Sequence, residues 1–149
     1  MARSTKLITA AYIMAFVASK APRRLNTDLV AKMVQAHPTR VRHITSTLTK
    51  AGLLKSYRGA SGGLTIARPA ETITLLDIYD AIQEGPLLTP GEHDPFSEWA
   101  SHCMVRPTFQ DIYAGVEDDM RRRLAEVRVI DLFRPWHGDE IEIVAKAGR

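Results

Sequence analysis

Cysteine is almost absent from this chain. Cys103 is the only one among 149 residues, so no disulfide can form within the chain. Small secreted domains depend on several disulfides, whereas proteins of the reducing cytoplasm keep few thiols and leave them reduced. The cysteine usage therefore favours a cytoplasmic protein over a secreted scaffold.

Acidic residues are scarce in the first half of the chain. Residues 1–70 contain twelve Lys and Arg side chains but a single acid, Asp28, which gives this half a formal charge of +11. Residues 71–149 contain eight basic and sixteen acidic side chains, a charge of −8, so that the whole chain carries +3. A dense basic surface attracts phosphate groups, and the split indicates a nucleic-acid partner for the first half. A solvated basic face without a partner is the alternative.

Signatures of catalysis are also missing. The sequence contains no Ser-His-acid arrangement and no HExxH metalloprotease motif. Its one Gly-rich stretch, residues 59–63, lacks the Lys-Ser/Thr pair and the helix N-terminus of a nucleotide cradle. We therefore expect no enzymatic activity.

The first helix is expected to be part of the core. An apolar stretch over residues 7–18 follows two basic residues and superficially resembles a secretory signal, but it contains polar residues and is too short to span a bilayer. We predict instead a helix from Ser4 or Thr5 to Ser19 that packs against the next module. Its predicted buried face consists of Leu7, Ile8, Ala11, Tyr12, Ala15 and Phe16.

Two short helices joined by a tight turn are predicted next. Asn26 or Thr27 can cap the first, which ends near Ala36. Pro38 suits the first turn of the second, and Gly52 ends it. The second helix has a predicted buried stripe of Val41, Ile44 and Leu48, with polar and basic residues elsewhere. This pattern is typical of a helix-turn-helix, whose second helix enters the major groove of DNA.

A β-hairpin with a basic tip follows the helix pair. Two strand-like runs, Leu53–Tyr57 and Leu64–Ala67, flank the sequence RGASGG. The glycines of this loop permit positive φ and a close approach to a phosphate, and Arg58 adds charge. The hairpin is therefore predicted to be the wing of a winged helix-turn-helix domain.

The acidic half is dominated by a long helical pattern. Thr74 is predicted to cap a helix that ends near Glu84, residues 85–105 to form a loop, and residues 106–134 to form one long helix. Acid-before-base pairs four residues apart, such as Glu117 with Arg121, are expected to stabilise its exposed face. Its apolar stripe consists of Phe109, Ile112, Val116, Met120, Leu124, Val127 and Ile130. So long a stripe cannot be wholly buried within a small chain. Part of it is expected to pack against the first helix, and a two-fold homodimer is expected to bury the rest.

The stretches LTKAGLLKSYRGASGGLTIAR, residues 48–68, and ITLLDIYDA, residues 73–81, resemble the Rrf2 family of bacterial winged-helix transcription regulators. The resemblance covers residues 1–134 and leaves a tail, residues 135–149. It implies a mainly α fold with a small β-hairpin wing: a DNA-binding domain over residues 1–84, a sensor-type loop over 85–105 and a dimerisation helix over 106–134. It also implies a homodimer that binds a double-stranded DNA operator, with the recognition helix in the major groove and the wing in the minor groove. Repression is expected rather than activation.

The resemblance further assigns residues to DNA. Thr39, Arg42 and His43 match base-reading positions of the recognition helix, and Arg58 matches the wing arginine. Better-known relatives carry Glu and Gln where this chain has Arg42 and His43, so their operators do not transfer. Contacts to the phosphate backbone are expected from Arg40, Ser46, Lys50 and Ser61, although Ser46 and Lys50 fit a solvated surface equally well.

The effector is the least determined feature. Several relatives hold an iron–sulfur cluster through three cysteines, whereas this chain keeps only Cys103, so neither a cluster nor a metal is predicted. Three alternatives are a soft metal bound by His93, His102 and Cys103, a redox-sensing Cys103 thiol, and an apolar effector pocket lined by Phe96 and Trp99. The simpler interpretations are polar loop residues, a thiol in the core and aromatic side chains that cover a core.

A winged-helix module for protein contacts, without sequence-specific DNA binding, is the main alternative function. Its long helix would be the docking surface. Salt distinguishes the two, because log K for DNA falls by about 0.9 for each phosphate that the protein neutralises.

Overall fold

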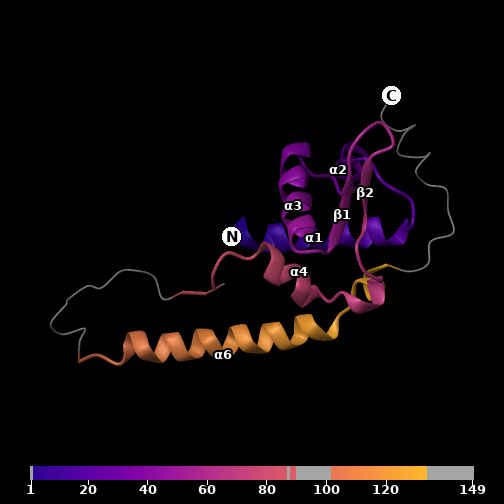
Figure 1. Ribbon diagram of the computed structural model, residues 1–149. Coiled ribbons are helices and arrows are strands. Elements are labelled where there is room, and N and C mark those ends of the chain that lie inside the picture. The colour runs from indigo at the N-terminus through magenta and orange to yellow at the C-terminus, as the bar shows by residue number, and fades with distance from the viewer. Residues whose placement is uncertain (1, 87, 90–101, 134–149) are drawn as a thin grey trace.

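A helical body with a two-stranded wing lies above one long helix in the computed structural model, which describes residues 2–86, 88–89 and 102–133 (Figure 1). The body contains α1 (Ala2–Ser19), α2 (Thr27–Met33), α3 (Pro38–Lys50), β1 (Leu54–Tyr57) and β2 (Gly63–Ile66). The chain continues through the 3₁₀ turn η1 (Ala70–Thr72), α4 (Leu75–Ile82), the long α6 (Val105–Glu126) and the 3₁₀ turn η2 (Val129–Leu132). The two strands pair antiparallel. The predicted fold class, mainly α with a hairpin wing, is confirmed.

The helix pair forms as its caps predict. The Asn26 side chain accepts a hydrogen bond from the backbone N–H of Asp28 (2.7 Å) and caps α2. Pro38 is the first residue of α3, and Gly52, with φ +73°, follows its C-cap. The predicted stripe of α3 is buried, with Val41, Ile44 and Leu48 at most 1% exposed. The polar face of α3 is thereby held outward.

The buried face of α1 differs from the predicted one. Its fully buried residues are Ala10, Ile13, Met14 and Val17, whereas Ile8 and Tyr12, from the predicted face, are 54% and 62% exposed. Only Leu7 and Phe16 of the predicted face pack against the core. The prediction was wrong because residues 7–18 are apolar nearly all round the helix, so the sequence does not define its inner side. The contacts of α1 with α3, α4 and η2 decide it.

The long helix is shorter than predicted because the chain leaves it to rejoin the core. After Glu126 the backbone extends, and the Val127 carbonyl accepts a hydrogen bond from the N–H of Leu75 (2.8 Å). The Val129 N–H donates to the carbonyl of Ile73 (2.8 Å), and the Val129 side chain is fully buried. No proline or glycine marks this point in the sequence, and the long-range pairing with the segment before α4 ends the helix.

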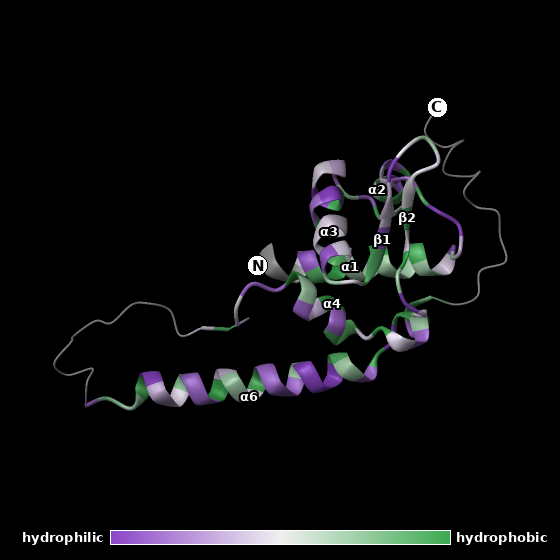
Figure 2. Cartoon of the chain, viewed as in Figure 1, coloured by the Kyte–Doolittle hydropathy of each residue, from purple (hydrophilic) through white to green (hydrophobic). Residues whose placement is uncertain are grey.

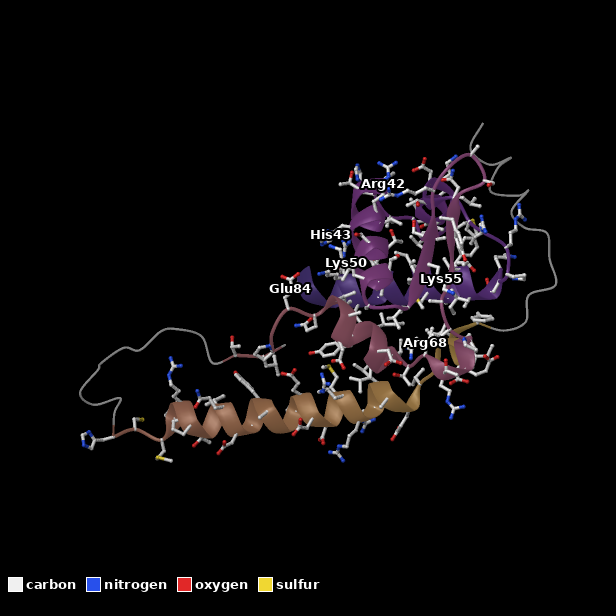
Figure 3. The ribbon with its side chains drawn as sticks, in the orientation of Figure 1. Arg42, His43, Lys50, Lys55, Arg68 and Glu84 are labelled. Atoms are coloured by element: carbon white, nitrogen blue, oxygen red, sulfur yellow. The ribbon has the colours of Figure 1, made fainter. Side chains whose placement is uncertain are left out.

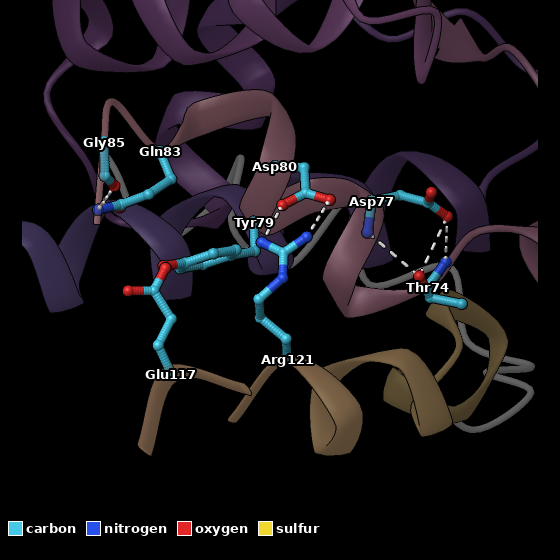
Figure 4. A network of polar contacts seen from close by, with 8 residues as sticks. All are labelled: Thr74, Asp77, Tyr79, Asp80, Gln83, Gly85, Glu117 and Arg121. Atoms are coloured by element: carbon cyan, nitrogen blue, oxygen red, sulfur yellow. Dashed lines mark hydrogen bonds and ion pairs between the residues drawn. The ribbon is translucent and has the colours of Figure 1, made fainter. Parts of the chain in front are cut away.

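The second half of α6 is joined to α4 by a polar network (Figure 4). The Tyr79 hydroxyl donates to Glu117 (3.2 Å), and Arg121 donates to both carboxylate oxygens of Asp80 (2.6 and 3.1 Å). Burial of the ring, with Glu117 beside it, raises the pKa of Tyr79. Arg121, expected to stabilise its own helix, thus forms its ion pair with another helix.

The first half of α6 extends beyond α4 and carries an exposed apolar stripe (Figures 1 and 2). Four large apolar side chains at helical spacing are each at least 45% exposed: Val105, Phe109, Ile112 and Val116.

Within the described ranges, none of the helices has the length and apolar character needed to cross a membrane.

Candidate nucleic-acid interface

The polar face of α3 contains six of the predicted DNA-contacting residues, and all six side chains are exposed. Arg42 lies at the N-terminal end of the helix, away from α4, as Figure 3 shows. The buried stripe fixes the rotation of α3, so this face cannot turn inward without exposing the core. The six residues are Thr39, Arg40, Arg42, His43, Ser46 and Lys50.

A polar cleft lies between α3, the start of α2 and the hairpin. Arg42, Ser46 and Lys50 line it together with residues for which the sequence predicted no DNA contact: Thr27, Thr45, Thr49, Ser56 and Leu64. Hydroxyl groups and cations are the side chains that hold phosphate oxygens in DNA complexes. The cleft thus adds Thr27 and Ser56 to the candidate phosphate contacts.

The wing is fixed to the segment before α2. Leu25 and Leu64 exchange backbone hydrogen bonds of 2.9 and 2.8 Å, so a single residue of this segment pairs alongside β2. Arg24 places its guanidinium 3.7 Å from the centre of the Tyr57 ring and donates to the carbonyl of Ser61 (3.3 Å). Arg58 and Ser61, the predicted wing contacts, are exposed at the loop that Arg24 supports.

Arg24 was missed by sequence reasoning. It lies 37 residues from Ser61, and no local pattern marks a contact over that distance. Its contacts with the wing account for one basic side chain whose role the charge count alone left open.

Two residues of the recognition helix have partners inside the chain. Arg42 forms an ion pair with Asp28 of α2, with 2.9 Å between Nη2 and Oδ1. Arg40 donates from Nη2 to the hydroxyl of Thr5 in α1 (2.9 Å). Asp28, the single acid of the basic half, therefore lies beside a predicted base-reading arginine. The sequence showed Asp28 to be unusual but gave no sign of its partner.

The other basic side chains differ in whether they form ion pairs, according to where they lie. Near α4, Lys6 lies 3.7 Å from Glu84 and Arg68 lies 3.6 Å from Asp77. By contrast, Lys50 and Arg58 form no ion pair within the part of the chain that the structure describes. Figure 3 shows Arg42 and Lys50 along α3 and Lys55 on the hairpin, so basic side chains lie on both elements of the predicted interface.

The sensor hypotheses concern residues around Cys103, which is partly buried just before α6. Of the proposed metal set, His102 and Cys103 are described, while His93 lies outside the described residues, as do Phe96 and Trp99 of the proposed pocket. Among the described residues, no three His, Cys, Asp or Glu side chains come together as metal ligands.

Comparison with known proteins assigns the chain to a family. Residues 3–135 match the model of the Rrf2 family, described as an iron-dependent transcriptional regulator. The chain belongs to the Rrf2 family. It is accordingly a transcriptional regulator with a DNA-binding fold, and not an enzyme.

Two relatives described as putative HTH-type transcriptional regulators come from Bacillus subtilis. The putative regulator YwgB is 27% identical over 104 residues, 68% of this chain and 64% of its own length. The putative regulator YwnA is 24% identical over 129 residues, 87% of this chain and 95% of its own length. The chain thus spans about two thirds of one relative and nearly all of the other.

Solved structures share the fold. CymR of B. subtilis, described as the global cysteine regulator, has a TM-score of 0.65 at 22% identity, over 86% of this chain and 92% of CymR. IscR of T. potens has a TM-score of 0.64 at 22% identity, over 86% and 82% of the two chains.

The donors of this chain do not fit a cysteine-ligated cluster of the kind some Rrf2 proteins hold. A [2Fe–2S] cluster normally takes four protein ligands, and each chain here supplies one thiolate. The absence of a cluster stays a prediction.

Proposed function

We propose that this Rrf2 protein is a cytoplasmic homodimer that reads a specific DNA operator and represses by occluding it. In this proposal α3 lies in the major groove and the wing reaches the minor groove. The observation that carries the proposal is the exposed polar face of α3 beside the hairpin, where Arg40, Arg42, Lys50 and Arg58 are all exposed.

The residues divide by the contact that each is suited to make. Arg42 presents a planar guanidinium that matches the O6 and N7 acceptors of guanine, and Thr39 and His43 lie beside it on the same exposed face. Ser46 and Lys50, with the hydroxyls of the cleft, are placed for phosphates. Arg58 belongs to the wing, where a narrow minor groove attracts arginine.

The exposed stripe on α6 supports the homodimer. Phe109, Ile112 and Val116 form a continuous apolar face on the half of the helix that extends beyond α4. A face of this kind can pair with its own copy across a two-fold axis, because each apolar stripe then buries the other from water. Two recognition helices related by such an axis fit a partly palindromic operator.

A titration at two salt concentrations tests DNA reading. The full chain is titrated against the promoter DNA beside its own gene and against random duplex. We expect tighter binding to the promoter and a steep loss of affinity with salt, and we expect Arg58→Ala to lower both affinities. Arg122→Ala, which removes the same charge from α6, serves as the matched control and should change neither. Equal, weak and salt-insensitive binding to both duplexes would favour the protein-docking module instead.

A second experiment tests the dimer. Ile112→Glu places a charge in the exposed stripe, and we expect sedimentation to change from dimer to monomer while the circular dichroism spectrum keeps its helical content. Operator affinity should fall with it. A wild-type chain that sediments as a monomer at micromolar concentration would refute the homodimer.

A further inference from the structure

Asp28 places a negative charge on the surface that is predicted to bind DNA. It is the only acidic residue among the first seventy, and its carboxylate lies on the basic face, 2.9 Å from the Arg42 guanidinium. Both side chains are exposed, at 61% and 62%. Exposed ion pairs contribute little to stability, so the ion pair with Arg42 does not by itself account for an acid that would repel DNA phosphates.

Local structure fixes the carboxylate where it is. Asp28 lies in the first turn of α2, and its backbone N–H donates to the Asn26 cap. A helix N-terminus favours a negative side chain, because the N–H groups of the first turn carry partial positive charge. The position of Asp28 is thus set by α2, and that of the Arg42 backbone by the buried stripe of α3.

The ion pair leaves Arg42 able to bind guanine. A guanidinium has five N–H donors, and Asp28 accepts one from Nη2. The second hydrogen of Nη2 and those of Nη1 remain for the O6 and N7 acceptors of guanine. Asp28 therefore does not block the guanine contact; it restricts the orientations from which Arg42 makes it.

The pair also limits the wrong contacts. A mobile arginine on a DNA-facing helix can reach phosphates at any sequence, which raises affinity without discrimination. A carboxylate that holds the guanidinium withdraws it from those phosphates and repels them as well. Both effects lower binding to arbitrary DNA more than binding to a site with guanine in register.

We propose that Asp28 is a positioning residue for base recognition, which orients Arg42 toward guanine and weakens non-specific DNA binding. The inference rests on the proposed function, since it assumes that Arg42 reads a base. It assigns a role in specificity to an acidic residue outside the recognition helix.

Asp28→Asn tests the inference, because it keeps the size of the side chain and removes the charge. Full-length wild type, Asp28→Asn and Arg42→Ala each select from a library of duplexes randomised over the operator length, and base preferences are obtained by sequencing. Affinities for the wild-type consensus and for random duplex are then measured at two salt concentrations. Glu71→Gln is the matched control, since it removes one exposed negative charge from η1.

We expect Asp28→Asn to bind random duplex several-fold more tightly. At one base pair per half-site, its preference for guanine should fall by about three- to tenfold, which is part of the roughly 5- to 150-fold that a bidentate contact provides. Arg42→Ala should lose the preference at that same base pair, and adding Asp28→Asn to it should change no base preference further. Glu71→Gln should leave the base preferences unchanged.

Two results would overturn the inference, and they are distinguishable. If Asp28→Asn raises all affinities equally and keeps the wild-type base preferences, Asp28 acts through charge alone, while the proposed function stands. If wild type itself selects no consensus, the proposed function fails and this inference fails with it.

Discussion

Gly63 lies where the wing meets the segment before α2, and it gives the sharpest test of how the wing is held. Its φ is +143°, and a Cβ built there would lie 2.8 Å from the carbonyl oxygen of Leu25. In Gly63→Ala the strained backbone costs about 1–3 kcal/mol. The collision also displaces Leu25 and disrupts its two hydrogen bonds with Leu64, at about 0.5–1.5 kcal/mol each. The expected loss of unfolding free energy is therefore about 2–6 kcal/mol.

Gly59→Ala separates the two contributions. Gly59 also has positive φ, +95°, but a Cβ there would have nothing within 4 Å. The substitution Gly59→Ala should therefore lower the free energy of unfolding only by the strain contribution, about 1–3 kcal/mol. Urea unfolding followed by circular dichroism measures both variants, with similar m-values if both denatured states are alike. Equal losses would show that the close approach of Gly63 to Leu25 contributes nothing, and the argument for a fixed wing would fail.

Three further outcomes test the packing of the body. Thr74→Ala removes the side chain that accepts from the Asp77 N–H (3.1 Å) in the capping box of α4, and urea unfolding should show a loss of about 1 kcal/mol; an unchanged midpoint would contradict the cap. Leu48→Ala empties a fully buried position of α3 and should cost about 2–5 kcal/mol by the same assay, a prediction that a loss well below this range would refute. The raised pKa of Tyr79 means that the folded protein keeps the phenolic proton at a pH where the unfolded chain, with its ordinary value of 10.0, has lost it. Stability should thus be intact below pH 10 and fall as the pH rises beyond it, more steeply in wild type than in Tyr79→Phe, and parallel curves would exclude Tyr79 as the cause.

The sequence determined the DNA-facing module closely. Asn26 marks a helix end through its side chain, and Pro38 and Gly52 do so through their backbone. Apolar residues spaced three and four apart set the buried stripe of α3. These are local properties, which explains why α2, α3 and the hairpin lie where they were predicted. The charge split likewise depends only on the order of charged residues along the chain.

Tertiary structure decided what local patterns leave open. The inner face of α1 depends on its neighbours, because α1 is apolar on several sides, and α6 ends at Glu126 because Val127 and Val129 pair with a segment about fifty residues earlier. The partners of individual side chains are also decided by tertiary structure. The Asp28–Arg42 ion pair and the contacts of Arg24 with the wing form only when separate elements pack. Neither contact has a repeating spacing in the sequence.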